Sequence, residues 1–187
     1  MNISRVSRQR TTLKKYMSID GYKMPSVFSK KYWVERYLKT DQYYVRAFVR
    51  CLRAEEYFTF IKSNEWMKYY YQRKKNRLGS RLGFFIPAGC FDTGLKIEHY
   101  GSIIVNPKSR IGKNCTLHGN CCIGSKGCYP DDSPVIGDNV DIGQNAQVLG
   151  GIAIADGVKI GAGAVVTKSV MEENVTVVGV PAKVIGK

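Results

Sequence analysis

Aliphatic residues recur at every sixth position through the second half of the chain. The series consists of Val105, Ile111, Leu117, Ile123 and, after one interruption, Ile136, Ile142, Val148, Ile154, Ile160 and Val166. A single hexad cannot bury its own aliphatic face, so copies must stack on one another. The period of six therefore predicts a mainly β fold, a solenoid of short strands over residues 84–187.

The first half of the chain follows a helical period instead. Two apolar stripes have this spacing: Tyr44, Val45, Phe48, Val49 and Leu52, then Trp66, Met67, Tyr70 and Tyr71. Asp41 and Ser63 precede the stripes and are residue types that cap helices, while Gly79 is a type that ends them. We therefore expect an α-helical N-terminal region over residues 1–83, with residues 1–24 as a mobile basic arm.

The net charge of +14 belongs to the helical half. Residues 1–83 hold 20 Lys and Arg against 6 Asp and Glu, whereas residues 84–187 hold 9 of each. Four cations fall within five positions, at Arg73, Lys74, Lys75 and Arg77. Such a cluster attracts an anionic membrane surface, an anionic polymer or a nucleotide phosphate, or it simply solvates a helix end. The aromatic residues have helical spacing, which favours packing over nucleic-acid binding.

Composition limits the compartment and the chemistry of the thiols. No stretch of about 20 apolar residues is present to span a bilayer, and residues 1–10 lack the apolar core of a secretory signal. We therefore expect a cytosolic protein, with reduced cysteines. Cys115 and Cys121 occupy the fifth hexad position, where other hexads have Val, Ala or Ile, and this predicts small buried side chains rather than disulfides.

The hexads resemble a known enzyme family. The chain is similar over residues 84–187 to the left-handed parallel β-helix acyltransferases, and the resemblance is carried by IGAGAVVTK (160–168) and VVGVPAKVI (177–185). Residues 94–124 look like the serine acetyltransferase branch, and more closely like its members encoded with capsule and exopolysaccharide genes. The resemblance implies a left-handed coil of three hexads, a homotrimer or a dimer of trimers, and acetyl-coenzyme A bound between neighbouring subunits.

Two histidines, His99 and His118, are the candidate catalytic bases. If a coil has 18 residues, position 99 stacks on position 117 and the two imidazoles meet at one edge. Imidazole titrates near neutral pH and can remove a hydroxyl proton. A thiolate of Cys90 or Cys128 is the alternative, as a nucleophile. Related zinc enzymes need three histidines, so we expect no metal.

The resemblance assigns the family's catalytic base to His99. Glu98 then stands where the family has an aspartate, and Phe84 stands where serine acetyltransferases have an orienting carboxylate. Glu98, Asp92 or a backbone carbonyl would therefore have to orient the imidazole of His99.

The interruption of the hexads bears on the acetyl acceptor. Serine acetyltransferases have Arg-His-Pro in this loop, whereas this chain has Asp131 and Asp132. Two aspartates repel a carboxylate but accept hydrogen bonds from sugar hydroxyls, unless they merely solvate a turn. We therefore expect acetyl transfer to a sugar of a surface polysaccharide, at the inner membrane face. The alternatives are transfer to free serine, and a non-catalytic scaffold or basic binding module.

The resemblance also implies the residues that bind the donor. The positions matched to the coenzyme-binding edge are Gln144, Ala162, Thr167 and Lys168, and either Lys183 or Lys187 is matched to the cations that meet the nucleotide phosphates. Lysines suit phosphates as point charges.

Overall fold

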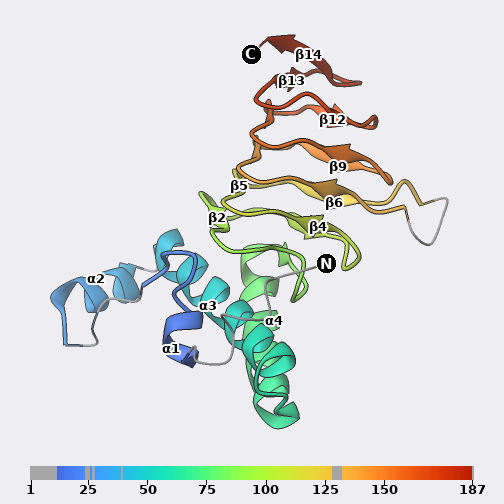
Figure 1. Cartoon of the computed structure of the whole chain (residues 1–187). Coiled ribbons are helices and arrows are strands. Elements are labelled where there is room, and N and C mark those ends of the chain that lie inside the picture. The colour runs from blue at the N-terminus through green and yellow to red at the C-terminus, as the bar shows by residue number, and fades with distance from the viewer. Residues whose placement is uncertain (1–11, 24–25, 27, 39, 128–131, 187) are drawn as a thin grey trace. The chain divides into compact units, whose positions relative to one another are not determined.

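The computed structural model describes residues 12–23, 26, 28–38, 40–127 and 132–186. The chain divides into two compact units, Met1–Leu82 and Gly83–Lys187 (Figure 1). Among the described helices, none combines the length and the apolar character needed to cross a bilayer.

The first unit is helical. Its helices are α1 (Leu13–Tyr16), α2 (Lys30–Leu38), α3 (Asp41–Phe60) and α4 (Glu65–Leu82). The predicted stripe of α3 forms the core of this unit, because Val45, Phe48, Val49 and Leu52 are all buried. Helix α3 packs mainly against α4.

The ends of α4 differ from the prediction. The backbone N–H of Met67 donates to the side-chain oxygen of Asn64 at 3.0 Å, so Asn64 caps the helix and Ser63 does not. Ser63 instead has a left-handed backbone, with φ of 47°. The helix continues through buried Gly79 and ends before Gly83, whose φ of +80° stops it.

Part of the expected mobile arm is held by a buried ion pair. Arg53 of α3 lies 2.6 Å from Asp20 and 2.8 Å from Glu56, and all three side chains are almost fully buried. Burial alone would lower the pKa of Arg53, but the carboxylates of Glu56 and Asp20 outweigh it and raise that pKa. Residues 12–23 are therefore anchored, while residues 1–11 and 24 lie outside the described residues.

The basic cluster of α4 does not lie wholly in solvent. Lys75 is buried, and its ammonium lies 2.9 Å from the carboxylate of Glu55 on α3. Lys74 is exposed and lies over the ring of Tyr70, 4.4 Å from its centroid. Lys75 and Lys74 thus both have partners within the helical unit.

The second unit contains three sheets that line the sides of one coil (Figure 1). The five-stranded sheet consists of β1 (Phe84–Phe85), β3 (Ile103–Val105), β6 (Cys122–Gly124), β9 (Gln147–Leu149) and β12 (Val165–Val166). The three-stranded sheet consists of β4 (Arg110–Ile111), β7 (Val135–Ile136) and β10 (Ala153–Ile154).

The six-stranded sheet is the longest. It consists of β2 (Lys96–Ile97), β5 (Thr116–Leu117), β8 (Asp141–Ile142), β11 (Lys159–Ile160), β13 (Thr176–Val178) and β14 (Lys183–Gly186). Its pairings are parallel except for β13 with β14, which is antiparallel. Consecutive hexads therefore pass to different sheets, and strands of one sheet come from successive coils.

The register shows that most coils hold three hexads but that the first is longer. Ile142 pairs with Ile160, 18 positions later, as the period predicts. Ile97 pairs with Leu117, 20 positions later. The expectation that position 99 stacks on position 117 is therefore wrong by two residues. The additional residues lie in the turn between β2 and β3, which carries His99.

The corners of the coil explain the Asn and Gly of the hexads. A left-handed backbone occurs at the fourth hexad position in Asn114, Asn120, Asn139, Asn145, Gly157 and Gly163. Asn and Gly adopt this conformation at lower cost than other residues. These corners turn the chain from one sheet to the next and set the length of each strand.

The interior of the coil is apolar, as the hexads predict. The sixfold aliphatic residues are buried along its whole length. Cys115 and Cys121 are 0% and 1% exposed, and burial raises the pKa of each thiol to about 11. They are free thiols that fill space, and no group of metal-binding side chains occurs among the described residues.

Candidate active site

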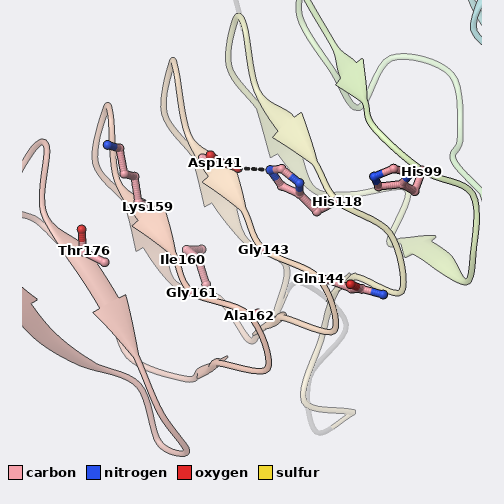
Figure 2. A pocket seen from close by; sticks show the side chains of 10 residues that line it. All are labelled: His99, His118, Asp141, Gly143, Gln144, Lys159, Ile160, Gly161, Ala162 and Thr176. Atoms are coloured by element: carbon pink, nitrogen blue, oxygen red, sulfur yellow. Dashed lines mark hydrogen bonds and ion pairs between the residues drawn. The ribbon is translucent and has the colours of Figure 1, made fainter.

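An open pocket of about 430 Å³ lies along the six-stranded sheet (Figure 2). Its lining residues are His99, His118, Asp141, Gly143, Gln144, Lys159, Ile160, Gly161, Ala162 and Thr176. All of them belong to the second unit, and they come from successive coils. The stacking of hexads thus brings ionisable and polar residues from distant parts of the sequence to one face.

The hexad pattern determines which side chains reach the pocket. The position before each buried aliphatic residue points outward, and the ladder pairs Asp141 of β8 with Lys159 of β11. The position after it is Gly143 or Gly161 in the middle coils. A Cβ on Gly143 would lie 2.7 Å from backbone atoms of the next coil, so only glycine fits there. These glycines leave the pocket floor without side chains.

A histidine and an aspartate form an ion pair inside the pocket. Nε2 of His118 lies 2.8 Å from Oδ1 of Asp141, across neighbouring strands β5 and β8 (Figure 2). The side chains are 36% and 45% exposed, so each remains accessible from the pocket. An imidazole oriented by a carboxylate is a common element of acid–base sites.

His99 lacks the orienting partner that we expected. The carboxylate of Glu98 pairs with Lys96 instead, and this hydrogen bond lowers the pKa of Glu98. Oδ1 of Asp92 accepts from the backbone N–H of Thr93 at 2.7 Å. Within the described part of the chain, no hydrogen bond or ion pair involves the ring of exposed His99.

The pocket gathers some of the predicted site residues and leaves out others. His99, His118, Gln144 and Ala162 line it together. The predicted residues outside the lining are Glu98, Thr167, Lys168, Lys183 and Asp132. Lys168 and Lys183 are exposed side chains of the same unit. Lys187, Asp131 and Cys128 lie outside the described residues.

Asp132 closes the loop that interrupts the hexads. Its carboxylate accepts hydrogen bonds from the backbone N–H groups of Lys126, at 3.0 Å, and of Gly151. The ammonium of Lys126 in turn donates to the carbonyl of Thr167 at 2.9 Å. These contacts give Asp132 a structural role in the loop, whereas we expected it to accept a hydrogen bond from a sugar hydroxyl.

Sequence reasoning missed Asp141, Lys159 and Thr176. Asp141 and Lys159 each precede a buried residue of the hexad series, and Thr176 precedes buried Val177, so each was readable as an outward position on the face of His118. The register places them in one ladder, with Asp141 and Lys159 18 positions apart and Lys159 and Thr176 17 positions apart. Cys90, the alternative nucleophile, is buried and is not part of the pocket.

Comparison with known families agrees with this architecture. Residues 133–168 match the family model described as bacterial transferase hexapeptide, six repeats. The hexads of this segment are therefore similar to bacterial transferase hexapeptide repeats.

Serine acetyltransferases are relatives of this hexapeptide-repeat chain. The enzyme of Buchnera aphidicola from Schizaphis graminum is 32% identical over 159 residues, which are 82% of this chain and 59% of that protein. The enzyme of Escherichia coli K12 is 34% identical over 102 residues, 54% of this chain and 37% of that protein. The chain therefore spans less than two thirds of the length of these relatives.

Solved serine acetyltransferases have a similar fold. The Neisseria gonorrhoeae enzyme has a TM-score of 0.67 and is 27% identical, with 94% of this chain and 66% of that chain covered. The Brucella abortus enzyme in complex with coenzyme A has a TM-score of 0.65 and is 25% identical, with 92% and 67% covered.

These comparisons correct the expected acceptor. We expected acetyl transfer to a sugar of a surface polysaccharide, and this expectation is wrong, because the relatives and structural neighbours named above are serine acetyltransferases. We based the sugar acceptor on Asp131 and Asp132. The carboxylate of Asp132, however, accepts hydrogen bonds from backbone N–H groups. A link to capsule or exopolysaccharide synthesis has no support.

Proposed function

We propose that this protein is a serine O-acetyltransferase that uses acetyl-coenzyme A as the donor. The observation that carries the proposal is the pocket with two imidazoles, in a chain whose relatives are serine acetyltransferases. The complex of the Brucella abortus enzyme with coenzyme A supports the choice of donor.

The reaction moves an acetyl group from a thioester sulfur to a hydroxyl oxygen. In this proposal the neutral imidazole of His99 takes the hydroxyl proton of serine while the oxygen attacks the thioester carbonyl carbon. The carbon–sulfur bond then breaks, and the imidazolium returns the proton to the coenzyme A thiolate. Glu98 assists because its carboxylate interacts electrostatically with His118 and His99. The exposed ring of His99 at the pocket supports this assignment.

The donor is proposed to lie along the floor of the pocket. Gly143, Gly161 and Ala162 have small or absent side chains, which leaves room for the narrow pantetheine arm beside Gln144. The remaining proposed contacts, toward the nucleotide end, are Thr167, Lys168 and Lys183. The two lysines are exposed and supply positive charge for phosphates.

The same family resemblance extends the proposal to the assembly and the compartment. It includes a left-handed coil and a homotrimer with acetyl-coenzyme A between subunits, and we keep the cytosolic location expected from composition. The net charge of +14 over residues 1–83 supports an additional attraction of the protein to the anionic inner membrane face.

A thiol-release assay with the full chain tests the proposal. We expect free coenzyme A to form from acetyl-coenzyme A when L-serine is added, with O-acetylserine identified by mass spectrometry. A reaction without enzyme and a reaction without acceptor measure the background hydrolysis. Release that L-serine does not raise above this background would refute the proposed function.

A further inference from the structure

The chemistry proposed above leaves the pair of His118 and Asp141 without a role. The two side chains meet at 2.8 Å inside the same pocket as His99, and neither is more than half exposed. Among the described residues, the carboxylate of Asp141 has no other hydrogen bond or ion pair. Lys159 neighbours it in the ladder, yet no ion pair joins them in the described part of the chain.

The contact with Asp141 fixes which nitrogen of His118 faces the pocket as an acceptor. An ionised carboxylate can only accept hydrogen bonds, so the shared proton lies on Nε2 of His118. In the neutral ring, Nδ1 then carries the lone pair. Figure 2 shows this second nitrogen on the side of the ring toward His99. The second oxygen of Asp141 is a further acceptor.

The surroundings of His118 favour a cation as the group that it binds. Glu98 belongs to the preceding coil and lies in register with His118, because Ile97 pairs with Leu117. Its carboxylate is bound by Lys96 and interacts electrostatically with both imidazoles. The carboxylate of Asp141 lies on the opposite side of the ring. An ammonium donor therefore matches the lone pair of Nδ1 and the two carboxylates that flank the ring.

We propose that His118, oriented by Asp141, binds the α-ammonium group of the serine acceptor beside His99. This inference rests on the proposed function and identifies the acceptor class as an α-amino acid. The hydroxyl and the ammonium of serine are on neighbouring carbons, so a serine whose hydroxyl meets His99 presents its ammonium to the adjacent imidazole. His118 is the binding residue, and Asp141 is the positioning residue that holds its tautomer.

Two acceptors that differ only in the ammonium test the inference. L-Serine and 3-hydroxypropionate share the hydroxyl and the carboxylate, and only serine has the ammonium. We expect the wild-type protein to prefer serine in kcat/KM. Asp141→Asn should raise the KM for serine about tenfold or more, since it removes a charge-assisted interaction. The serine preference should fall by the same factor, while the KM for acetyl-coenzyme A should stay within about twofold.

A second variant and a charge-matched control complete the experiment. His118→Ala removes the acceptor nitrogen and should reduce the serine preference as Asp141→Asn does. Glu173→Gln removes an exposed carboxylate of the same unit outside the pocket and should leave the preference intact. Circular dichroism of each variant checks that the fold is retained.

The outcomes separate the inference from the proposed function. A variant Asp141→Asn that keeps the wild-type preference, or that loses kcat equally with both acceptors, overturns the inference and leaves serine acetylation standing. The second of these results would make His118 a general acid–base group. A wild-type protein that acetylates neither compound overturns the proposed function and the inference together.

Discussion

At the scale of single residues, the site contains two imidazoles with different environments. Asp141 holds the ring of His118, whereas no hydrogen bond or ion pair holds the ring of His99 within the described part of the chain. A carboxylate-bound ring is fixed in one tautomer, and a free exposed ring can turn toward a substrate. This difference supports the two proposed roles, acceptor binding for His118 and proton transfer for His99.

The role of His99 predicts a loss of rate with an intact fold. Because general base catalysis contributes about 10²-fold or more, His99→Ala should lower serine-dependent thiol release by that factor. The exposed ring contributes little to packing, so the thermal unfolding curve should stay close to that of the wild type. Full activity in this variant would exclude His99 as the base and transfer that role to His118.

The buried thiols predict a dependence of stability on pH. Burial raises the pKa of Cys115 and Cys121 from 9.0 to about 11, so their contribution to stability is present below pH 9 and is lost as the pH rises toward 11. The free energy of unfolding, from denaturant titrations at pH 8 and pH 10.5, should fall over this range.

A double variant isolates the contribution of the thiols. Ala occupies the same hexad position at residues 146 and 164, so Cys115→Ala with Cys121→Ala should fit the coil. Its unfolding free energy should decline less between the two pH values. An equal decline in both proteins would show that the thiols do not cause it.

At the scale of elements, the helices and the coil differ in how far sequence predicted them. The hexad series and the fifth hexad position predicted the buried apolar residues from Val105 to Val166, because each copy repeats the same packing. The ends of α4 were misassigned, because Ser63 and Asn64 are both capping types and only their backbone conformations distinguish them. For α3 and the coil, the pattern specified the buried face more firmly than the boundaries, whereas Trp66 and Tyr70 of the α4 stripe are 88% and 48% exposed.

The site was only partly predictable for a related reason. His99 and His118 were found because histidines are rare in this chain, but Asp141 was not, since nothing in its own hexad distinguishes it from a solvated aspartate. Its significance depends on the longer turn between β2 and β3 and on the interrupted coil before β7, which together set the register. The period of the repeat cannot predict which residues pair across a coil of irregular length.

The anchoring of residues 12–23 predicts a large effect of one buried charge. Asp20→Ala removes one carboxylate partner of buried Arg53, and breaking a buried ion pair costs about 3–5 kcal/mol. The free energy of unfolding of the helical unit, from urea titration followed by circular dichroism, should fall by an amount in this range.

A surface pair provides the control for this variant. Glu65 of α4 pairs with Lys68 at 3.2 Å but is well exposed, so Glu65→Ala should cost less than about 1 kcal/mol. If Asp20→Ala were as mild as this control, the segment 12–23 would not be held by the ion pair.

At the scale of the whole molecule, charge and chemistry belong to different units. The excess of cations lies within residues 1–83, and the pocket lies within the hexad unit. On the five-stranded sheet, Phe85 and Ile104 are neighbours in register and are 59% and 48% exposed. Apolar residues that are exposed side by side favour contact with another protein surface.

These residues support a prediction about the assembly. We expect a homotrimer, so light scattering in solution should give three times the chain mass of 21.0 kDa. Ile104→Asp should shift the mass toward that of the monomer if this strip is part of the subunit contact. A wild-type monomer would contradict the proposed assembly.

The central claim is that stacked hexads bring an imidazole, a thioester donor and a serine hydroxyl together on the six-stranded sheet. A crystal structure of the protein with coenzyme A and L-serine tests it most directly. The account predicts coenzyme A along Gly143, Gly161 and Ala162, with the serine hydroxyl within about 3 Å of a ring nitrogen of His99. Coenzyme A bound away from this sheet, or a serine hydroxyl beyond reach of that ring, would contradict it.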